Sequence, residues 1–272
     1  MAATVIEPFP TSATKNPLDL LRTLPLDKLT DAKTNIELIP KLGLYPHEDW
    51  SRNEFPKALW PFCGHGIGLW QYPNQFGPYL ATLAKISLVR PIRSYLEIGV
   101  AGGGTFITTM ELLRRLVPTV CGFGIDPAPP GQVYWEQKEG KTPFANPTQA
   151  YFDTPAHQST FLQGRSQERL SDASLPKIID LVLVDGDHSY EAVRSDVLRV
   201  RDRTNILVLH DIVSDACPGV ERCWNELVLE LTQGVDPAWK AFTFTSQYEE
   251  CRQRNQGKWF LGIGMLIRTK WL

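Results

Sequence analysis

Five short apolar runs recur between residues 93 and 211, and longer amphipathic stretches separate several of them. The runs are rich in Val, Ile and Leu and are bounded by turn residues, which is the pattern of buried strands. Strands that alternate with helices imply parallel strands joined by right-handed crossovers, so the sequence predicts a doubly wound α/β fold. The runs are RSYLEIGV (93–100), TVCGFGID (119–126), STFLQG (159–164), IIDLVLVDG (178–186) and NILVLHD (205–211).

Two further apolar runs near the C-terminus complete the predicted sheet. AFTFTSQ (241–247) and GIGMLIRT (262–269) would supply its last two strands, an antiparallel pair at one edge. The expected domain, residues 91–272, is thus a Rossmann-like, mostly parallel seven-stranded sheet with helices around it. The spacing of apolar residues predicts helices over 105–116, 190–201 and 218–231.

The N-terminal third differs in composition from this domain. Residues 1–15 are rich in Pro, Thr, Ser and Ala and offer little apolar area, so we expect a disordered tail. Residues 16–90 are expected to form a helical and irregular cap, with a short helix at 16–24 and another helix at 79–89. Residues 50–78 are dense in aromatics, Pro and Gly and predict no regular element.

One connection inside the sheet domain is longer than a plain crossover needs. Residues 127–158 separate the second predicted strand from the third, and connections of such length usually carry structure or function of their own. We expect this insertion to hold a helix and a lid loop.

Composition and charge favour a small-molecule partner. The 272 residues include 28 Lys and Arg against 30 Asp and Glu, and there is no basic block of the kind that binds nucleic acid or anionic membranes. No run of about eighteen apolar residues predicts a membrane span, and the N-terminus has no secretory pattern. Five widely spaced cysteines without a C-x-x-C pair predict reduced thiols in the cytoplasm. The pattern is compatible with a homo-oligomer.

The first predicted strand runs into a glycine-rich turn, YLEIGVAGGGTF (95–106). In an open parallel sheet the ligand crevice lies at the carboxyl ends of the strands, where backbone N–H groups of such a turn meet a cofactor. A dinucleotide-binding fingerprint would need glycine in place of Ala101, and a phosphate-binding loop would need a lysine that this turn lacks. Both of these patterns are therefore disfavoured.

What remains is E-x-G-x-x-x-G, formed by Glu97, Gly99 and Gly103, which resembles the first motif of class I S-adenosylmethionine-dependent methyltransferases. The resemblance implies that Glu97 lies near the methionine end of this cofactor, that the glycines admit it, and that Thr105 contacts it. The alternative is a glycine-rich strand-to-helix turn that is required only for close packing.

Two more segments lie where a nucleoside would be expected. Asp126 ends the second predicted strand, where a carboxylate can accept from both ribose hydroxyls, although an Asp can also open a Pro-rich turn. GRSQE (164–168) resembles the G-x-S-Q-D/E segment of catechol-type O-methyltransferases, which implies that Ser166 and Gln167 lie at the adenine. Alternatively, Ser166 caps the next helix.

Acids follow the fourth and fifth predicted strands, in VDGDHSY and LHD. If these two strands are neighbours in the sheet, their ends lie about 5 Å apart, and Asp185 and Asp211 are then able to bind one cation. Oxygen ligands suit Mg²⁺, and another divalent cation is compatible with them. Such an ion lowers the pKa of a substrate hydroxyl, and His188 is the candidate base for its proton. Capping of turns and helices is the alternative role of both acids.

D-x-x-H followed by an acid after the fifth strand is similar to metal-dependent antibiotic-sugar O-methyltransferases, whereas catechol-type relatives carry lysine at the position of His188. The pair His210–Asp211 departs from these families, which usually have two acids or Asp-Asn there. His210 is therefore a candidate metal ligand, or a group that only hydrogen-bonds a backbone carbonyl behind the site. Asp187 is a candidate ligand through a water.

Four aromatic residues precede the predicted sheet domain: Trp60, Phe62, Trp70 and Tyr72. They are able to form an apolar wall over an acceptor. Aromatic residues near Pro and Gly more often only pack a cap, so packing is the favoured interpretation.

These patterns predict transfer of a methyl group from S-adenosylmethionine to a hydroxyl of a small-molecule acceptor, assisted by Mg²⁺. Asp185 is predicted to bind the cation, to contact the cofactor and to act as a catalytic residue. The resemblance further implies natural-product biosynthesis. A metal-dependent hydrolase that uses Asp185, Asp187, His188 and Asp211 is an alternative, because it accounts for the acids. A non-catalytic binding protein that keeps the fold is a third possibility.

Overall fold

The structure, a computed structural model, describes residues 16–45, 53–64, 66–132, 146–233 and 237–272. The predicted tail lies wholly outside these ranges. The predicted lid loop falls largely on residues 133–145, which are outside them as well, so both expectations stay predictions. The helix expected in the same insertion is present as α8 (Pro147–Phe152).

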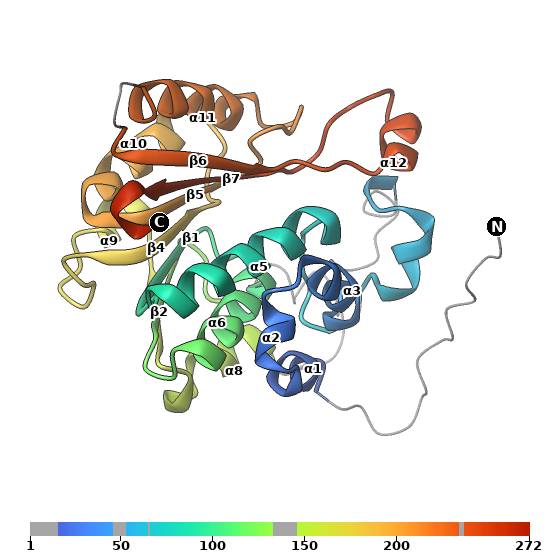
Figure 1. The fold of residues 1–272 in the computed structure, drawn as a ribbon, viewed down its shortest axis with the longest axis horizontal. Coiled ribbons are helices and arrows are strands. Elements are labelled where there is room, and N and C mark those ends of the chain that lie inside the picture. The colour runs from blue at the N-terminus through green and yellow to red at the C-terminus, as the bar shows by residue number, and fades with distance from the viewer. Residues whose placement is uncertain (1–15, 46–52, 65, 133–145, 234–236) are drawn as a thin grey trace.

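A seven-stranded sheet forms the centre of the molecule, in the order β3-β2-β1-β4-β5-β7-β6 (Figure 1). The first five strands in this order pair in parallel, while β7 runs antiparallel to both of its neighbours. This confirms the predicted mostly parallel sheet with an antiparallel edge. The strands are β1 (Ser94–Ile98), β2 (Cys121–Asp126), β3 (Ser159–Gln163), β4 (Ile179–Val184), β5 (Thr204–His210), β6 (Trp239–Phe244) and β7 (Ile263–Arg268).

Helices cover both faces of the sheet (Figure 1). The face with α5 and α6 also carries the N-terminal helices, and the opposite face carries α10 and α11. No helix of the described ranges is long and apolar enough to cross a membrane. Besides α8, the α-helices of the described ranges are α1 (Leu18–Thr23), α2 (Leu26–Leu29), α3 (Ala32–Leu42), α5 (Pro73–Val89), α6 (Gly104–Leu116), α9 (Ser166–Arg169), α10 (Tyr190–Val200), α11 (Pro218–Leu231) and α12 (Glu249–Arg254). Short 3₁₀ helices are η1 (Lys57–Phe62), η2 (Pro155–His157), η3 (Arg201–Arg203) and η4 (Thr269–Trp271).

The strands divide their side chains between two hydrophobic layers. In β5, Ile206 and Val208 belong to the cluster beneath α5 and α6, whereas Leu207 and Leu209 belong to the cluster beneath α10 and α11. Successive side chains of a strand point to opposite faces, so a central strand covered on both sides is apolar at every position. This is why the sequence shows continuous apolar runs and no alternation with polar residues.

Helix α5 begins at Pro73, six residues before the predicted start, so the expectation of no regular element before residue 79 was wrong. Pro73 occupies the first turn, where the missing N–H has no helical partner to lose. Gly77 lets α3 approach closely, because a Cβ on Gly77 would lie 2.7 Å from the backbone nitrogen of Ile36. Packing against α3 therefore stabilises a helical turn that local propensity disfavours.

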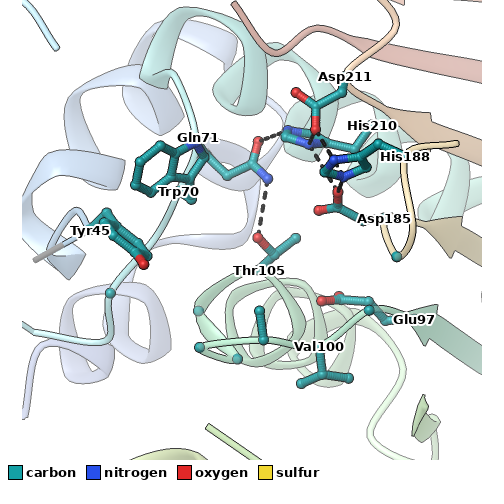
Figure 2. Close-up of a pocket in the computed structure, with 17 residues that line it drawn as sticks. Tyr45, Trp70, Gln71, Glu97, Val100, Thr105, Asp185, His188, His210 and Asp211 are labelled. Carbon is teal, nitrogen blue, oxygen red and sulfur yellow. Dashed lines mark hydrogen bonds and ion pairs between the residues drawn. The ribbon is translucent and has the colours of Figure 1, made fainter. Parts of the chain in front are cut away.

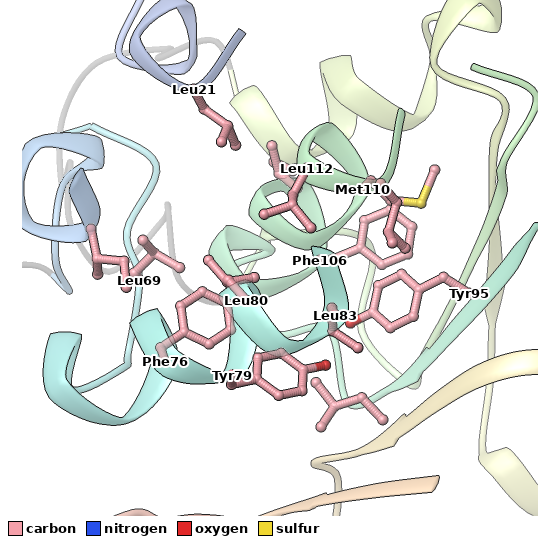
Figure 3. Close-up of a cluster of buried hydrophobic side chains, with 14 of the residues drawn as sticks. Leu21, Leu69, Phe76, Tyr79, Leu80, Leu83, Tyr95, Phe106, Met110 and Leu112 are labelled. Atoms are coloured by element: carbon pink, nitrogen blue, oxygen red, sulfur yellow. The ribbon is translucent and has the colours of Figure 1, made fainter. Parts of the chain in front are cut away.

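The N-terminal helices share one hydrophobic core with the sheet. Leu21 of α1 and Leu80 of α5 belong to the same buried cluster as Tyr95 of β1 and Phe106 of α6 (Figure 3). The rings of Tyr95 and Phe106 stack with their centroids 5.5 Å apart. The predicted boundary between a cap and a sheet domain at residue 90 stays a prediction.

The strand order reverses direction at β1, next to β4, in the middle of the sheet. From β1 the chain first adds β2 and β3 on one side, and then crosses to add β4 and β5 on the other. Crossovers leave in opposite directions at such a switch point, which opens a crevice at the carboxyl ends of the two central strands. The glycine turn after β1 and Asp185 after β4 both lie there.

A tight contact between α11 and β7 gives a test of this packing. A Cβ on Gly264 would lie 2.7 Å from the indole ring of Trp224, so Gly264→Ala must displace that ring. Overpacking of this kind costs about 1 to 3 kcal/mol of unfolding free energy, which urea denaturation would measure. The control is Thr243→Val on the exposed strand opposite Gly264, expected to change stability by about 0.5 kcal/mol or less. Equal effects of the two substitutions would contradict the tight contact.

Candidate active site

A cavity of about 350 Å³ lies at the switch point (Figure 2). The turn after β1 and the N-terminus of α6 form one wall, and the acids and histidines that follow β4 and β5 form another. The third wall comes from residues that precede α5. The lining residues are Tyr45, Gly68, Trp70, Gln71, Glu97, Gly99 to Thr105, Asp185, Gly186, His188, His210 and Asp211.

Close packing accounts for two of the turn's glycines. Gly99 has φ +90°, and a Cβ there would lie 2.0 Å from the carbonyl oxygen of Asp185. Gly103 has φ +81°, and a Cβ there would lie 2.3 Å from Thr148. Close packing by itself would therefore require glycine at both positions, and their role in holding a cofactor stays a prediction. Close packing does not account for the cavity that the same turn lines.

Glu97 is a buried acid that lines this cavity, with 1% of its surface exposed. Within the described residues its carboxylate accepts a hydrogen bond from the Tyr95 hydroxyl and from no Lys or Arg. Burial raises the pKa of Glu97 well above its usual value, and the nearby charge of Asp185 adds to the rise. A cationic group of a ligand would stabilise the ionised carboxylate, and the α-ammonium group of S-adenosylmethionine is such a group.

Asp126 lies at the carboxyl end of β2 beside the glycine turn. Its Oδ2 accepts from the backbone N–H of Ala101 at 3.0 Å, and its Oδ1 accepts from that of Ala128 at 2.9 Å. Each carboxylate oxygen has a further lone pair, so this carboxylate still has capacity to accept from ribose hydroxyls.

The GRSQE segment lies outside the cavity lining. Ser166 is buried, and its hydroxyl donates to Asp196 of α10 at 2.6 Å. Ser166 is the first residue of α9, and Arg165 occupies the cap position, so Ser166 is not a helix cap. Gln167 is exposed.

Two acids and two histidines meet at the carboxyl ends of β4 and β5 (Figure 2). His210 Nδ1 lies 3.2 Å from an oxygen of Asp185 and 3.2 Å from an oxygen of Asp211. His188 Nε2 lies 3.6 Å and 3.4 Å from oxygens of the same two acids. The ligand atoms of Asp185, His210 and Asp211 all lie within 4.8 Å of one another, which is close enough to hold one metal ion.

Asp211 reaches this cluster through an unusual backbone conformation. Its φ is +62°, in the left-handed region, which Asp adopts more readily than most residues. Its carbonyl oxygen accepts from the N–H of Ser214, which closes a turn after β5. Left-handed residues other than glycine cluster at functional sites, because surrounding structure must hold them.

The charges within the cluster shift its pKa values in opposite directions. Burial works to raise the pKa of Asp185, but the charge of His210 and hydrogen bonds from both histidines outweigh it and bring the value to about 2. Burial works to lower the pKa of His210, and the charges of Asp185 and Asp211 outweigh it and raise the value well above normal. In the absence of a cation, the ionised carboxylates of this cluster are thus paired with protonated His210.

His188 is the outermost member of the cluster, with 42% of its side chain exposed. Its Nδ1 lies 3.3 Å from the thiol sulfur of Cys217. The hydrogen bond with Asp185, followed by that with Cys217, raises the pKa of His188 to about 10. His188 is therefore protonated at neutral pH as long as Asp185 remains its partner.

Several lining residues were given no role by the sequence patterns. Gln71 bridges His210 and Thr105, and its position four residues after Ile67 in an irregular segment carries no local signal (Figure 2). Tyr45 packs edge-on against Trp70, with ring centroids 4.0 Å apart. Glu54 is not among the lining residues, but burial, aided by the charge of Asp211, raises the pKa of Glu54 to about 7.

The other sequence candidates, apart from Trp70, lie away from the cavity lining. Asp187 is exposed, and its carboxylate accepts from the backbone N–H of Ser189 at the start of α10. Of the four aromatic residues considered for an acceptor wall, Trp70 lines the cavity. Tyr72 is buried in the core, and Trp60 and Phe62 pack against that core.

Residues 96–212 match a family model described as a methyltransferase domain. This span runs from β1 to just beyond β5 and contains the glycine turn, Asp126 and the acid–histidine cluster. The match covers less than half of the chain, so the comparison shows a likeness to a methyltransferase domain for this part of the chain. A comparison with curated proteins finds no match.

Solved methyltransferase structures resemble the chain at low identity. The O-methyltransferase TomG from Streptomyces achromogenes is 15% identical, with a TM-score of 0.48 over 91% of this chain and 100% of that one. An O-methyltransferase from Bacillus cereus is 10% identical, with a TM-score of 0.46 over 92% and 94%. The O-methyltransferase NovP is 14% identical, with a TM-score of 0.49 over 88% and 99%. At these values the neighbours indicate no acceptor for this chain.

The ion pairs around His188 predict its titration. In protein freed of metal, NMR of the imidazole ring should show a pKa of about 10, and Asp185→Asn should bring it down towards the usual 6.5 by removing the first cause of the shift. Because the folded-state pKa is raised, protonated His188 stabilises the fold fully below about pH 6.5, and this contribution is lost as the pH rises through about 10. A pKa that stays the same in Asp185→Asn would contradict this assignment.

Proposed function

We propose that the chain transfers the methyl group of S-adenosylmethionine to a hydroxyl of a small-molecule acceptor, with a divalent cation at Asp185 and Asp211 and with His188 as base. The observation that carries the proposal is one shared cavity. It joins the glycine turn and Glu97 to the acid–histidine cluster, so a cofactor and an acceptor bound there would be in contact.

For the cofactor, the proposal assigns the methionine end to Glu97 and the ribose to Asp126. Gly99 and Gly103 place no side chain in the cavity, and Thr105 lies in the first turn of α6 beside them. We keep Ser166 and Gln167 as proposed adenine contacts on the strength of the sequence resemblance alone. When bound, S-adenosylmethionine supplies an electrophilic methyl group on a sulfonium.

For the acceptor, the cluster matches the needs of a hydroxyl better than those of an amine. A neutral amine is already nucleophilic, whereas a hydroxyl must be deprotonated to react well. A divalent cation, for which Mg²⁺ was the sequence prediction, supplies a Lewis acid that lowers the pKa of such a hydroxyl. Asp185, Asp211 and His210 would hold the cation, and the three ligand atoms fit around one ion.

His188 would then accept the hydroxyl proton. Its raised pKa comes first from the hydrogen bond with Asp185, so any partner that occupies Asp185 lowers the pKa and leaves the ring able to act as a base at neutral pH. Its partial exposure at the cavity lets the proton pass on to water.

The lining also bears on the class of acceptor. Three of the described lining residues, Glu97, Asp185 and Asp211, are acids, and no described lining residue is Lys or Arg. A phosphate backbone would be repelled there, which supports a small molecule over a nucleic acid. Natural-product biosynthesis stays a proposal.

The setting of the protein is also proposed. No disulfide joins the five cysteines, which all lie in the described ranges, and this is consistent with a cytoplasmic protein. A homo-oligomer remains compatible with the fold.

The hydrolase alternative accounts for the acid–histidine cluster, but it assigns no purpose to the cavity wall formed by the glycine turn and Glu97. Release of phosphate or ester products without added cofactor would support it. A non-catalytic binding protein would bind the cofactor tightly without any effect of metal.

Cofactor binding tests the first half of the proposal. Calorimetric titration with S-adenosylhomocysteine should show micromolar binding, and Glu97→Gln should weaken it about 10-fold to 100-fold, since a charged hydrogen bond contributes about 1.5 to 3 kcal/mol. Asp126→Ala should also weaken it. Glu191→Gln, on an exposed acid of α10, is the control and should bind like the wild type. Absence of binding by the wild type would overturn the assignment of the cavity.

Turnover tests the second half. His188→Ala should lower the rate of methyl transfer about 100-fold or more while S-adenosylhomocysteine still binds, because a general base contributes 10² to 10⁴ in rate. The assay would follow S-adenosylhomocysteine release with a panel of phenols, sugars and hydroxy acids. An unchanged rate in His188→Ala would remove the base assignment, and activity that persists in chelator would remove the cation.

A further inference from the structure

His210 places a nitrogen donor beside the two carboxylates of the proposed cation site. Its ring is 3% exposed, so it is held in one position by its surroundings. Nδ1 faces the two carboxylates at 3.2 Å, and it is this atom that lies within reach of a shared ion.

Gln71 determines which ring nitrogen faces the acids. Its side-chain oxygen lies 3.0 Å from His210 Nε2, and its side-chain nitrogen lies 3.2 Å from the hydroxyl of Thr105 (Figure 2). In this arrangement Gln71 accepts the Nε2–H of His210, so the proton of a neutral ring resides on Nε2. The lone pair of Nδ1 is then directed into the cluster.

We propose that Gln71 is a positioning residue that makes His210 a metal ligand through Nδ1, and that the resulting site prefers a first-row transition ion to Mg²⁺. The inference rests on the proposed cation site at Asp185 and Asp211. A histidine that binds metal donates its other N–H to a fixed acceptor, and Gln71 is such an acceptor. Imidazole suits Fe, Ni, Cu and Zn, whereas Mg²⁺ is best served by oxygen ligands alone.

Gln71 lies outside the matched methyltransferase span but contacts residues inside it. Gln71 precedes the 96–212 span that matches the methyltransferase domain, and its contact with His210 joins residues 139 positions apart. Its other partner, Thr105, stands in the first turn of α6 beside the glycine turn. A single buried amide therefore connects the proposed cofactor wall to the proposed metal wall.

Cobalt is a suitable probe because Co²⁺ bound to nitrogen and oxygen ligands absorbs visible light. Full-length protein freed of metal would be titrated with Co²⁺, and Mg²⁺ would be added in competition. The wild type should bind Co²⁺ more tightly than Mg²⁺. Gln71→Leu should weaken Co²⁺ binding about 10-fold to 100-fold, the usual effect of removing an acceptor behind a ligating histidine.

Two substitutions separate positioning from a loss of fold. Gln71→Glu keeps an acceptor oxygen for His210 and should restore Co²⁺ binding relative to Gln71→Leu. His210→Asp supplies an oxygen ligand and should reverse the preference, with weaker Co²⁺ and tighter Mg²⁺ binding, a result that misfolding does not produce.

Gln75 offers a matched control. It is also a fully buried glutamine, but the hydrogen bonds of its amide join it to the backbone of Ser246, Phe260 and Gly262 and not to His210. Gln75→Leu should lower thermal stability and leave the affinity for Co²⁺ unchanged.

The outcomes distinguish this inference from the proposed function. Equal Co²⁺ affinity in the wild type and Gln71→Leu, or tighter binding of Mg²⁺ than of Co²⁺ by the wild type, would overturn the inference and leave the cation site standing. If the wild type binds neither Co²⁺ nor Mg²⁺, both the inference and the proposed cation site are overturned.

Discussion

The close approach of two backbone turns is the constraint on which the site depends. Gly99 after β1 lies against the carbonyl of Asp185 after β4, and no side chain fits between them. Parallel pairing of β1 with β4 fixes this approach, and the reversal of strand order at the same place opens the cavity above it. This one contact thus fixes the distance between the glycine turn of the proposed cofactor wall and Asp185 of the proposed metal wall.

The matched methyltransferase domain does not complete the cavity by itself. Tyr45, Trp70 and Gln71 all precede residue 96, and they supply the wall that faces the acids and the glycine turn. The buried cluster around α5 holds this segment against the sheet, since it includes residues of α1, α3, α5 and β1 without a break. Packing of the N-terminal helices therefore positions side chains that take part in the proposed chemistry.

Sequence patterns predicted the central strands, in which nearly every side chain is buried. The central strands are apolar at every position because helices cover both faces, and Asp185 and Asp211 were placed together because neighbouring parallel strands end together. The start of α5 was missed because Pro73 and Gly77 disfavour a helix locally and only contact with α3 stabilises it. Gln71 was missed for a related reason: its role depends on a partner 139 residues away, and no local periodicity reports such a contact.

The position of β7 in the sheet bears on how the chain is made. β5 is buried at every residue, and within the described residues the edge that faces away from β4 pairs with β7, which is formed by residues 263–268. While the ribosome is still producing the segment after β5, that edge presents unpaired N–H and C=O groups on an entirely apolar strand, a condition that favours aggregation. The cavity residues are all synthesised by then, but the sheet that holds them stays open at this edge until some fifty further residues have emerged. We therefore expect β5 to be the strand of this sheet that most needs protection during synthesis.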